Sequence, residues 1–148
     1  MEAANWFQVK VALDKMSEGG VVKKQSEVYL VDALSYTEAE ERIIEEVSPF
    51  SQGVLEIKDI KHRKFVELFE SQSDSDDKWF ECKVIYVILD EKTAQEKKTA
   101  VLMLVQAGDL RGAVKRLDEG MKGSMMDYEI HTVKETPILD IYKYKSKK

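Results

Sequence analysis

Hydrophobic and polar residues alternate near the start of the chain, in WFQVKVAL at residues 6–13, and a second strand is predicted at residues 24–33. This alternation, rich in valine and aromatic residues, is typical of half-buried β-strands. The sequence SEGG at residues 17–20 is a turn signal. The two segments are therefore predicted to form a β-hairpin.

A helix is predicted directly after this hairpin. Ser35 and Glu38 have the spacing of a capping box, in which the hydroxyl accepts from an N–H of the first turn and the carboxylate reaches back. Ala39, Ile43 and Val47 then follow at intervals of four and mark one apolar face. Strands are predicted near residues 54–61 and 64–69.

The second half repeats this pattern of elements. Asp109, another good N-cap residue, precedes an apolar helical stripe. The stripe is formed by Leu110, Ala113, Val114, Leu117 and Met121. Strands are predicted at residues 79–89, 98–106, 127–134 and 137–143.

The two halves are also similar residue by residue. Residues 23–47 align without gaps on residues 97–121, and eight of the 25 positions are identical. Unrelated chains would share roughly one or two. Trp6 aligns with Trp79 and Lys10 with Lys83 upstream, and FVELF at residues 65–69 aligns with ILDIY at 138–142 downstream. This order indicates a tandem duplication.

The predicted fold class is α+β, a tandem duplication of a β-β-α-β-β unit with antiparallel sheets and one helix per repeat. Residues 1–70 form the first repeat, 71–78 an acidic linker, and 79–148 the second repeat. One helix leaves one face of each sheet uncovered, so we expect the repeats to pack with pseudo-two-fold symmetry as one globular domain. Because a duplication can replace a homodimer, we expect a monomer.

Composition narrows the class of protein. Hydrophobic residues make up 43% of the 148 residues, enough for a core, and the net charge is −5. An acidic balance argues against non-specific coating of nucleic acid, which depends on neutralising phosphates. No apolar run approaches the roughly 20 residues of a membrane span, and no signal peptide is visible. A single cysteine, Cys82, suggests a reducing, cytoplasmic setting. No membrane is expected as a partner, because no span is predicted.

The candidate binding residues are aromatic and basic. Trp6 and Trp79 open equivalent strands, each followed by a lysine, Lys10 or Lys83. Such a pattern suits a stacking platform, although aromatic strand residues more often pack in a core.

A basic turn is predicted between the last two strands of the first half. It contains Lys61, Arg63 and Lys64, whereas its counterpart at residues 134–137 is not basic. This divergence makes the turn a candidate phosphate contact, with a solvated turn as the ordinary alternative.

No catalytic or metal site is predicted. His62 and His131 lack ligand spacing, and DSDD at residues 74–77 lacks the glycine and distal glutamate of a calcium loop. Cys82 lies mid-strand, where a buried thiol is the usual role. We therefore expect no cofactor.

Three stretches carry a resemblance over nearly the whole chain. WFQVKVALDK, VYLVDALSYTEAE and LVQAGDLRGAVKRLDEGMKGSMMDYEI resemble an uncharacterised domain family of gut anaerobic bacteria and their phages and mobile elements. The resemblance implies an intracellular accessory protein, and it transfers no activity and no site residues.

These features favour a non-catalytic binding module with an unknown protein or small ligand as its partner. The expected surface is the seam between the repeats, where two similar units create a concavity. One alternative is a single-stranded nucleic-acid binder that uses the strand aromatics and lysines, against which the net charge stands. The other alternative is an enzyme without a recognisable motif.

Overall fold

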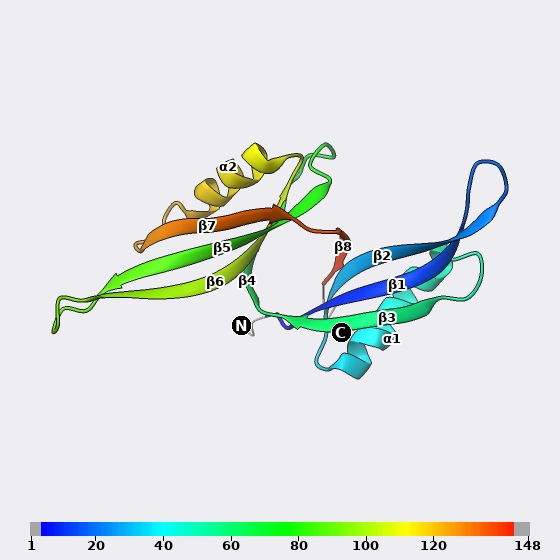
Figure 1. Ribbon diagram of the computed structural model, residues 1–148, viewed down its shortest axis with the longest axis horizontal. Helices are drawn as coiled ribbons and strands as arrows, with labels where there is room; N and C mark the ends of the chain where they lie inside the picture. Colours follow the sequence, from blue (N-terminus) through cyan, green and yellow to red (C-terminus); the bar gives the residue numbers. More distant parts are fainter. Residues whose placement is uncertain (1–3, 144–148) are drawn as a thin grey trace, which may run out of the picture. The chain divides into compact units, whose positions relative to one another are not determined.

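The computed structural model describes residues 4–143, which form two compact units. The first unit holds residues 4–63 and 137–143, and the second runs from Lys64 to Thr136. Each unit is a four-stranded sheet with one helix on one face (Figure 1). The predicted α+β class is confirmed. No helix in the described range is long and apolar enough to cross a membrane.

The sheet of the first unit has the strand order β3-β1-β2-β8. Strand β1 pairs antiparallel with both β2 and β3, whereas β8 pairs parallel with β2. A short 3-10 turn, Ser48–Phe50, continues from the helix. The elements are β1 (Trp6–Met16), β2 (Val22–Asp32), α1 (Tyr36–Val47), β3 (Glu56–Arg63) and β8 (Ile138–Tyr142).

The second unit has the same kind of sheet, with the order β4-β6-β5-β7. Strand β5 pairs antiparallel with β6 and β7, and β4 pairs parallel with β6. The elements are β4 (Phe65–Phe69), β5 (Lys78–Leu89), β6 (Glu96–Ala107), α2 (Leu110–Met121) and β7 (Asp127–Glu135).

The fourth strand of each sheet comes from the other half of the sequence. Only Lys64 separates β3 from β4, yet β4 joins the second sheet; β8 follows β7 closely and joins the first. The prediction placed residues 64–69 with the first repeat and 137–143 with the second, and made both sheets fully antiparallel. The fourth strands are parallel, so the antiparallel prediction is wrong for them. A five-residue apolar segment predicts a strand but does not specify which sheet it joins.

The chain therefore changes units at 63/64 and 136/137, and the acidic segment 71–78 lies within the second unit. There it connects β4 to β5 rather than one repeat to the next.

Both helices begin as the capping residues predict. The Ser35 hydroxyl accepts from the Glu38 N–H at 3.1 Å, and the Glu38 carboxylate accepts from the Leu34 N–H at 3.3 Å. In α2, the Asp109 carboxylate accepts from the Gly112 N–H at 2.8 Å. These bonds satisfy backbone donors that lack partners within the helices.

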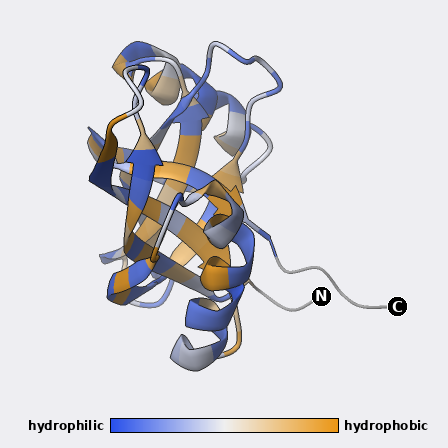
Figure 2. Cartoon of the chain, turned by 90° about the vertical axis from the view of Figure 1, so that its right-hand side faces the viewer, coloured by the Kyte–Doolittle hydropathy of each residue, from blue (hydrophilic) through white to orange (hydrophobic). Residues whose placement is uncertain are grey.

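Each unit has its core between the helix and one sheet face. In the first unit β1 and β2 contribute alternate residues, and α1 contributes Ala39, Ile43 and Val47 as predicted. In the second, Ala113, Leu117 and Met121 of α2 are buried, whereas Leu110 is exposed and Val114 half-buried. Figure 2 shows hydrophobic and hydrophilic residues alternating along the strands. Each fully buried leucine or isoleucine in these cores contributes roughly 1.5–3 kcal/mol.

Candidate binding sites

Both tryptophans of the expected stacking platform are buried. Trp6 is 5% exposed and Trp79 is 4% exposed. Their neighbours Phe7 and Phe80 belong to the helix-side cores, so the tryptophans lie on the opposite face of each sheet. A base can stack only on an exposed ring face, and neither ring offers one.

The basic candidate residues of the first unit differ in their exposure and in their contacts. Lys10 is exposed on β1 and faces away from α1. Lys61 is exposed and lies 3.9 Å from the Asp59 carboxylate. Arg63 is half-buried and donates to the Gln8 side chain at 3.2 Å. Residues 61–63 are the end of β3, so the predicted basic turn is instead an extended strand that runs on through Lys64 towards β4.

Lys64 and Lys83 line one pocket of about 280 Å³ in the second unit, which we name the two-lysine pocket. The remaining lining residues are Val66, Ala100, Val101 and Leu102. Lys83 lies opposite Leu102 in the β5–β6 pair, so both side chains project from the same sheet face. The core positions Cys82 and Val84 alternate with Lys83, which places the lysine on the face away from α2.

The two-lysine pocket has a simple chemical character. The side chains of Lys64 and Lys83 make no hydrogen bond or ion pair with another residue of the described range. The other lining residues are aliphatic. Two cations above an apolar floor suit a ligand with an anionic head and a hydrocarbon part.

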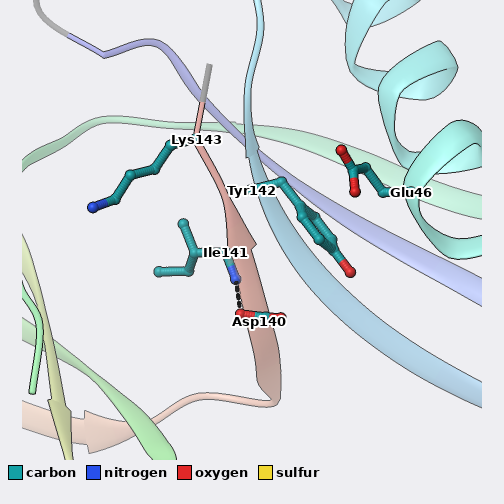
Figure 3. Close-up of a pocket in the computed structure, with 5 residues that line it drawn as sticks. All are labelled: Glu46, Asp140, Ile141, Tyr142 and Lys143. Carbon is teal, nitrogen blue, oxygen red and sulfur yellow. Dashed lines mark hydrogen bonds between the residues drawn. The ribbon is translucent and has the colours of Figure 1, made fainter. Parts of the chain in front are cut away.

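A second pocket, of about 380 Å³, lies in the first unit beside β8, and we name it the edge-strand pocket. It is lined by Glu46 of α1 and by Asp140, Ile141, Tyr142 and Lys143 (Figure 3). Tyr142 and Glu46 lie on the helix side of β8, whereas the Ile141 and Lys143 side chains point to the other side. None of these residues was predicted as a site.

A polar cluster lies behind Tyr142. Its ring is 5.7 Å from the ring of Tyr29, and the Tyr29 hydroxyl donates to Glu27 at 2.7 Å. Glu27 is buried, but it also accepts from Gln25 at 3.0 Å and pairs with Lys15 at 3.3 Å. These partners satisfy a carboxylate that would be costly to bury alone.

Both tyrosines of this cluster have raised pKa values. Burial is the largest cause of the raised pKa of Tyr142, followed by the negative charges of Asp140, Glu46 and Glu27. Burial also raises the pKa of Tyr29, together with its hydrogen bond to Glu27. Both phenols therefore stay protonated at neutral pH and can donate hydrogen bonds.

Residues 5–144 match the family described as "Domain of unknown function (DUF4494)". The chain belongs to this family. The match spans both units and every residue of both pockets in this DUF4494 chain. Neither the comparison with curated proteins nor that with solved structures found a match.

The two units of the DUF4494 chain differ at the edge-strand pocket. In the repeat alignment, Tyr142 corresponds to Phe69 and Glu46 to Gly120. An added Cβ on Gly120 would lie 2.5–2.8 Å from three atoms of the Phe69 ring, so Phe69 packs directly on the helix there. In the second unit, therefore, the Phe69 ring fills the position that corresponds to the edge-strand pocket of the first unit.

One sequence signal could have found this difference. Glu27 occupies a core-facing position of β2 where the aligned residue of β6 is Val101. A carboxylate that interrupts an apolar alternation indicates a buried polar network. Tyr142, whose ring lies 5.7 Å from that of Tyr29, is more than a hundred residues from Glu27 in the sequence, and the pairing of β8 with β2 brings it to this network.

The remaining reactive groups of the DUF4494 chain form no constellation within residues 4–143. Burial raises the pKa of Cys82 to about 11, with the Glu81 charge as a smaller cause, so the thiol stays protonated. The His62 ring lies 2.5 Å from the Asn5 side chain, and His131 is exposed. No group of three acidic, histidine or cysteine residues able to hold a metal ion occurs there.

Proposed function

We propose that this protein is a non-catalytic binding module whose two-lysine pocket takes a small organic anion with an apolar part. The convergence of Lys64 and Lys83 on an aliphatic floor carries the proposal. We also propose that the protein is cytoplasmic. As the resemblance implies, its proposed setting is gut anaerobic bacteria with their phages and mobile elements.

The lining residues support binding rather than catalysis. Apart from the two lysines, every lining residue is aliphatic, so the pocket holds no paired acid and base. The lysines would attract and orient an anionic head, while Leu102 and Val66 would contact a hydrocarbon chain. Removal of apolar surface from water would add affinity that does not depend on salt.

Binding of alkyl phosphates to the full chain tests this proposal. Hexyl phosphate supplies both features, inorganic phosphate lacks the apolar part, and hexylammonium reverses the charge. Calorimetry should detect hexyl phosphate and neither control. Lys83→Gln and Lys64→Gln should each weaken binding about three- to fivefold, as for partly exposed ion pairs.

Lys10→Gln is the matched control, because Lys10 aligns with Lys83 and is also a strand cation that faces away from its helix. Equal losses in Lys10→Gln and Lys83→Gln would show that net charge, not the pocket, attracts the anion. Failure of hexyl phosphate to bind would also overturn the proposal.

A single-stranded nucleic acid is the competing ligand. Burial of Trp6 and Trp79 and the net charge of −5 both weigh against it. If the chain binds oligo-dT with an affinity that falls steeply with salt, and hexyl phosphate does not compete, nucleic-acid binding replaces the proposal.

We also propose that the chain arose by tandem duplication and that its units are related by a pseudo-two-fold. Both sheets have the same strand order when β1 is matched with β5, and both have a parallel fourth strand. An experimental structure should superpose residues 6–63 on 79–136 with the aligned pairs coincident. A one-residue shift along β1 and β5 would contradict common origin, because it exchanges the two sheet faces.

A further inference from the structure

Strand β8 lies at the end of its sheet and carries backbone groups that β2 does not use. The Ile141 N–H donates to the Asp140 carboxylate at 2.8 Å, a side-chain acceptor on β8 itself. Because alternate residues of an edge strand direct their N–H and C=O groups outward, Leu139 and Ile141 share this outer edge. An uncovered edge of this kind can accept another strand.

The edge-strand pocket runs along this edge. Four consecutive residues, 140–143, line one side and Glu46 of α1 lines the other (Figure 3). A groove between an edge strand and a helix is a shape that binds extended peptides by adding a strand to the sheet. Lys143 is already fixed at the end of the groove, because its C=O accepts from the Arg42 guanidinium at 2.9 Å.

The negative charge of the groove favours a peptide with basic side chains. No ion pair joins Glu46 or Asp140 to another described residue. Tyr142 presents a half-buried ring on the same side of β8 as Asp140, while the Lys143 side chain points away. Carboxylates beside an aromatic ring suit a lysine or arginine, whose methylenes contact the ring and whose cation reaches the carboxylates.

We propose that the outer edge of β8 binds an extended peptide with basic side chains as a fifth strand of the first sheet. A peptide C=O would accept the hydrogen bond from the Ile141 N–H in place of the Asp140 carboxylate. The carboxylate would then be available to pair with a peptide cation. The second unit does not offer the same groove, because Phe69 fills the corresponding position against Gly120. This proposal is independent of the two-lysine pocket.

The test uses the full chain and a labelled, end-capped hexapeptide of alternating valine and lysine. One control peptide has glutamine for lysine, and another has proline at a central valine, which removes an N–H needed for strand pairing. The lysine peptide should bind best, and the proline peptide about fivefold more weakly, the size expected for loss of a backbone hydrogen bond. Amide exchange at Ile141 should slow only with the lysine peptide.

The variants separate the groove from general acidity. Asp140→Asn and Glu46→Gln should each weaken binding about three- to fivefold. The Asp140→Asn side chain keeps an oxygen that can accept from the Ile141 N–H, so the edge strand should remain folded. Glu45→Gln, at the exposed neighbouring position of α1, is the matched control and should bind as the unaltered chain does.

Three outcomes would overturn the proposal. The lysine peptide does not bind; the proline peptide binds as well as the lysine peptide, which excludes strand addition; or Glu45→Gln loses as much affinity as Glu46→Gln, which leaves only non-specific attraction to the acidic helix.

Discussion

The Arg116 guanidinium of α2 holds the Asp76 carboxylate, with Nη2 2.9 Å from Oδ2. Ser71, two residues beyond β4, donates to the same carboxylate at 2.5 Å. Arg42, which aligns with Arg116, donates to the C=O of Lys143, directly after β8. In each unit, therefore, an arginine of the helix fixes the end of the fourth strand.

Loss of the Asp76 contacts should loosen the second unit in a pH-dependent way. The hydrogen bond from Ser71 is the largest cause that lowers the Asp76 pKa below its ordinary 3.8, followed among the lowering causes by the Arg116 charge. A lowered pKa stabilises the fold above the unfolded value, and this contribution is lost as pH falls below 3.8. Asp76→Asn should lower the thermal midpoint at pH 7 and flatten its fall below pH 4. Asp74→Asn, at an exposed position of the same loop, is the control. Equal shifts of the thermal midpoint in the two variants would contradict the stabilising role of the Asp76 contacts.

Replacement of Tyr29 by phenylalanine should destabilise the first unit. The substitution removes a hydrogen bond to the buried Glu27, a loss of about 1.5–3 kcal/mol for a charged acceptor. Because burial raises the Tyr29 pKa above 10.0, the fold should also lose stability as pH rises beyond 10. Urea unfolding at pH 7 and pH 10.5 checks both effects. Tyr29→Phe should lose less stability between these pH values than the unaltered chain; an unchanged pH dependence would refute the assignment.

Gly120→Ala offers a test of packing between α2 and β4. Alanine favours a helix by about 1 kcal/mol over glycine. Its Cβ would meet the Phe69 ring at 2.5–2.8 Å, and such overpacking costs about 1–3 kcal/mol. Gly120→Ala alone should therefore be neutral to destabilising. In a Phe69→Ala background, the same change should stabilise by about 1 kcal/mol. Additive effects in the double-mutant cycle would mean that the two residues do not contact each other.

The two units should unfold together, since each sheet contains a strand from the other half of the sequence. Trp6 lies in the first unit and Trp79 in the second, and both are buried. Trp79→Phe and Trp6→Phe would leave one fluorescent reporter in each unit. Unfolding followed by fluorescence should coincide with unfolding followed by circular dichroism in both variants. Separate midpoints for the two signals would show that the units are independent.

Local features of the fold could be predicted from the sequence. The alternation of WFQVKVAL predicts β1, and Ser35 and Asp109 predict both helix starts, because these signals act between residues close in the chain. Placement of β4 and β8 could not be predicted in this way. FVELF and ILDIY are equally suited to either sheet, and long-range pairing decides between them.

Prediction of the candidate sites had the same limit. Lys64 and Lys83 are each identifiable as basic residues, but their common pocket depends on the pairing of β4 with β6. Glu46 and Tyr142 belong to one groove only because β8 joins β2. The sequence does contain one pointer to these sites, namely the positions at which the two repeats diverge, such as Glu27 and Val101.

The position of β8 at the end of the sequence has a consequence for synthesis on the ribosome. Strands β1, β2 and β3 and helix α1 leave the ribosome first, but the outer edge of β2 has no partner until β8 is made, after the whole second unit. That edge carries Val28 and Leu30, which are buried in the finished fold. The nascent chain thus exposes an apolar, pairing-competent edge throughout the translation of residues 64–136. Its first half stays unfinished until its last strand emerges.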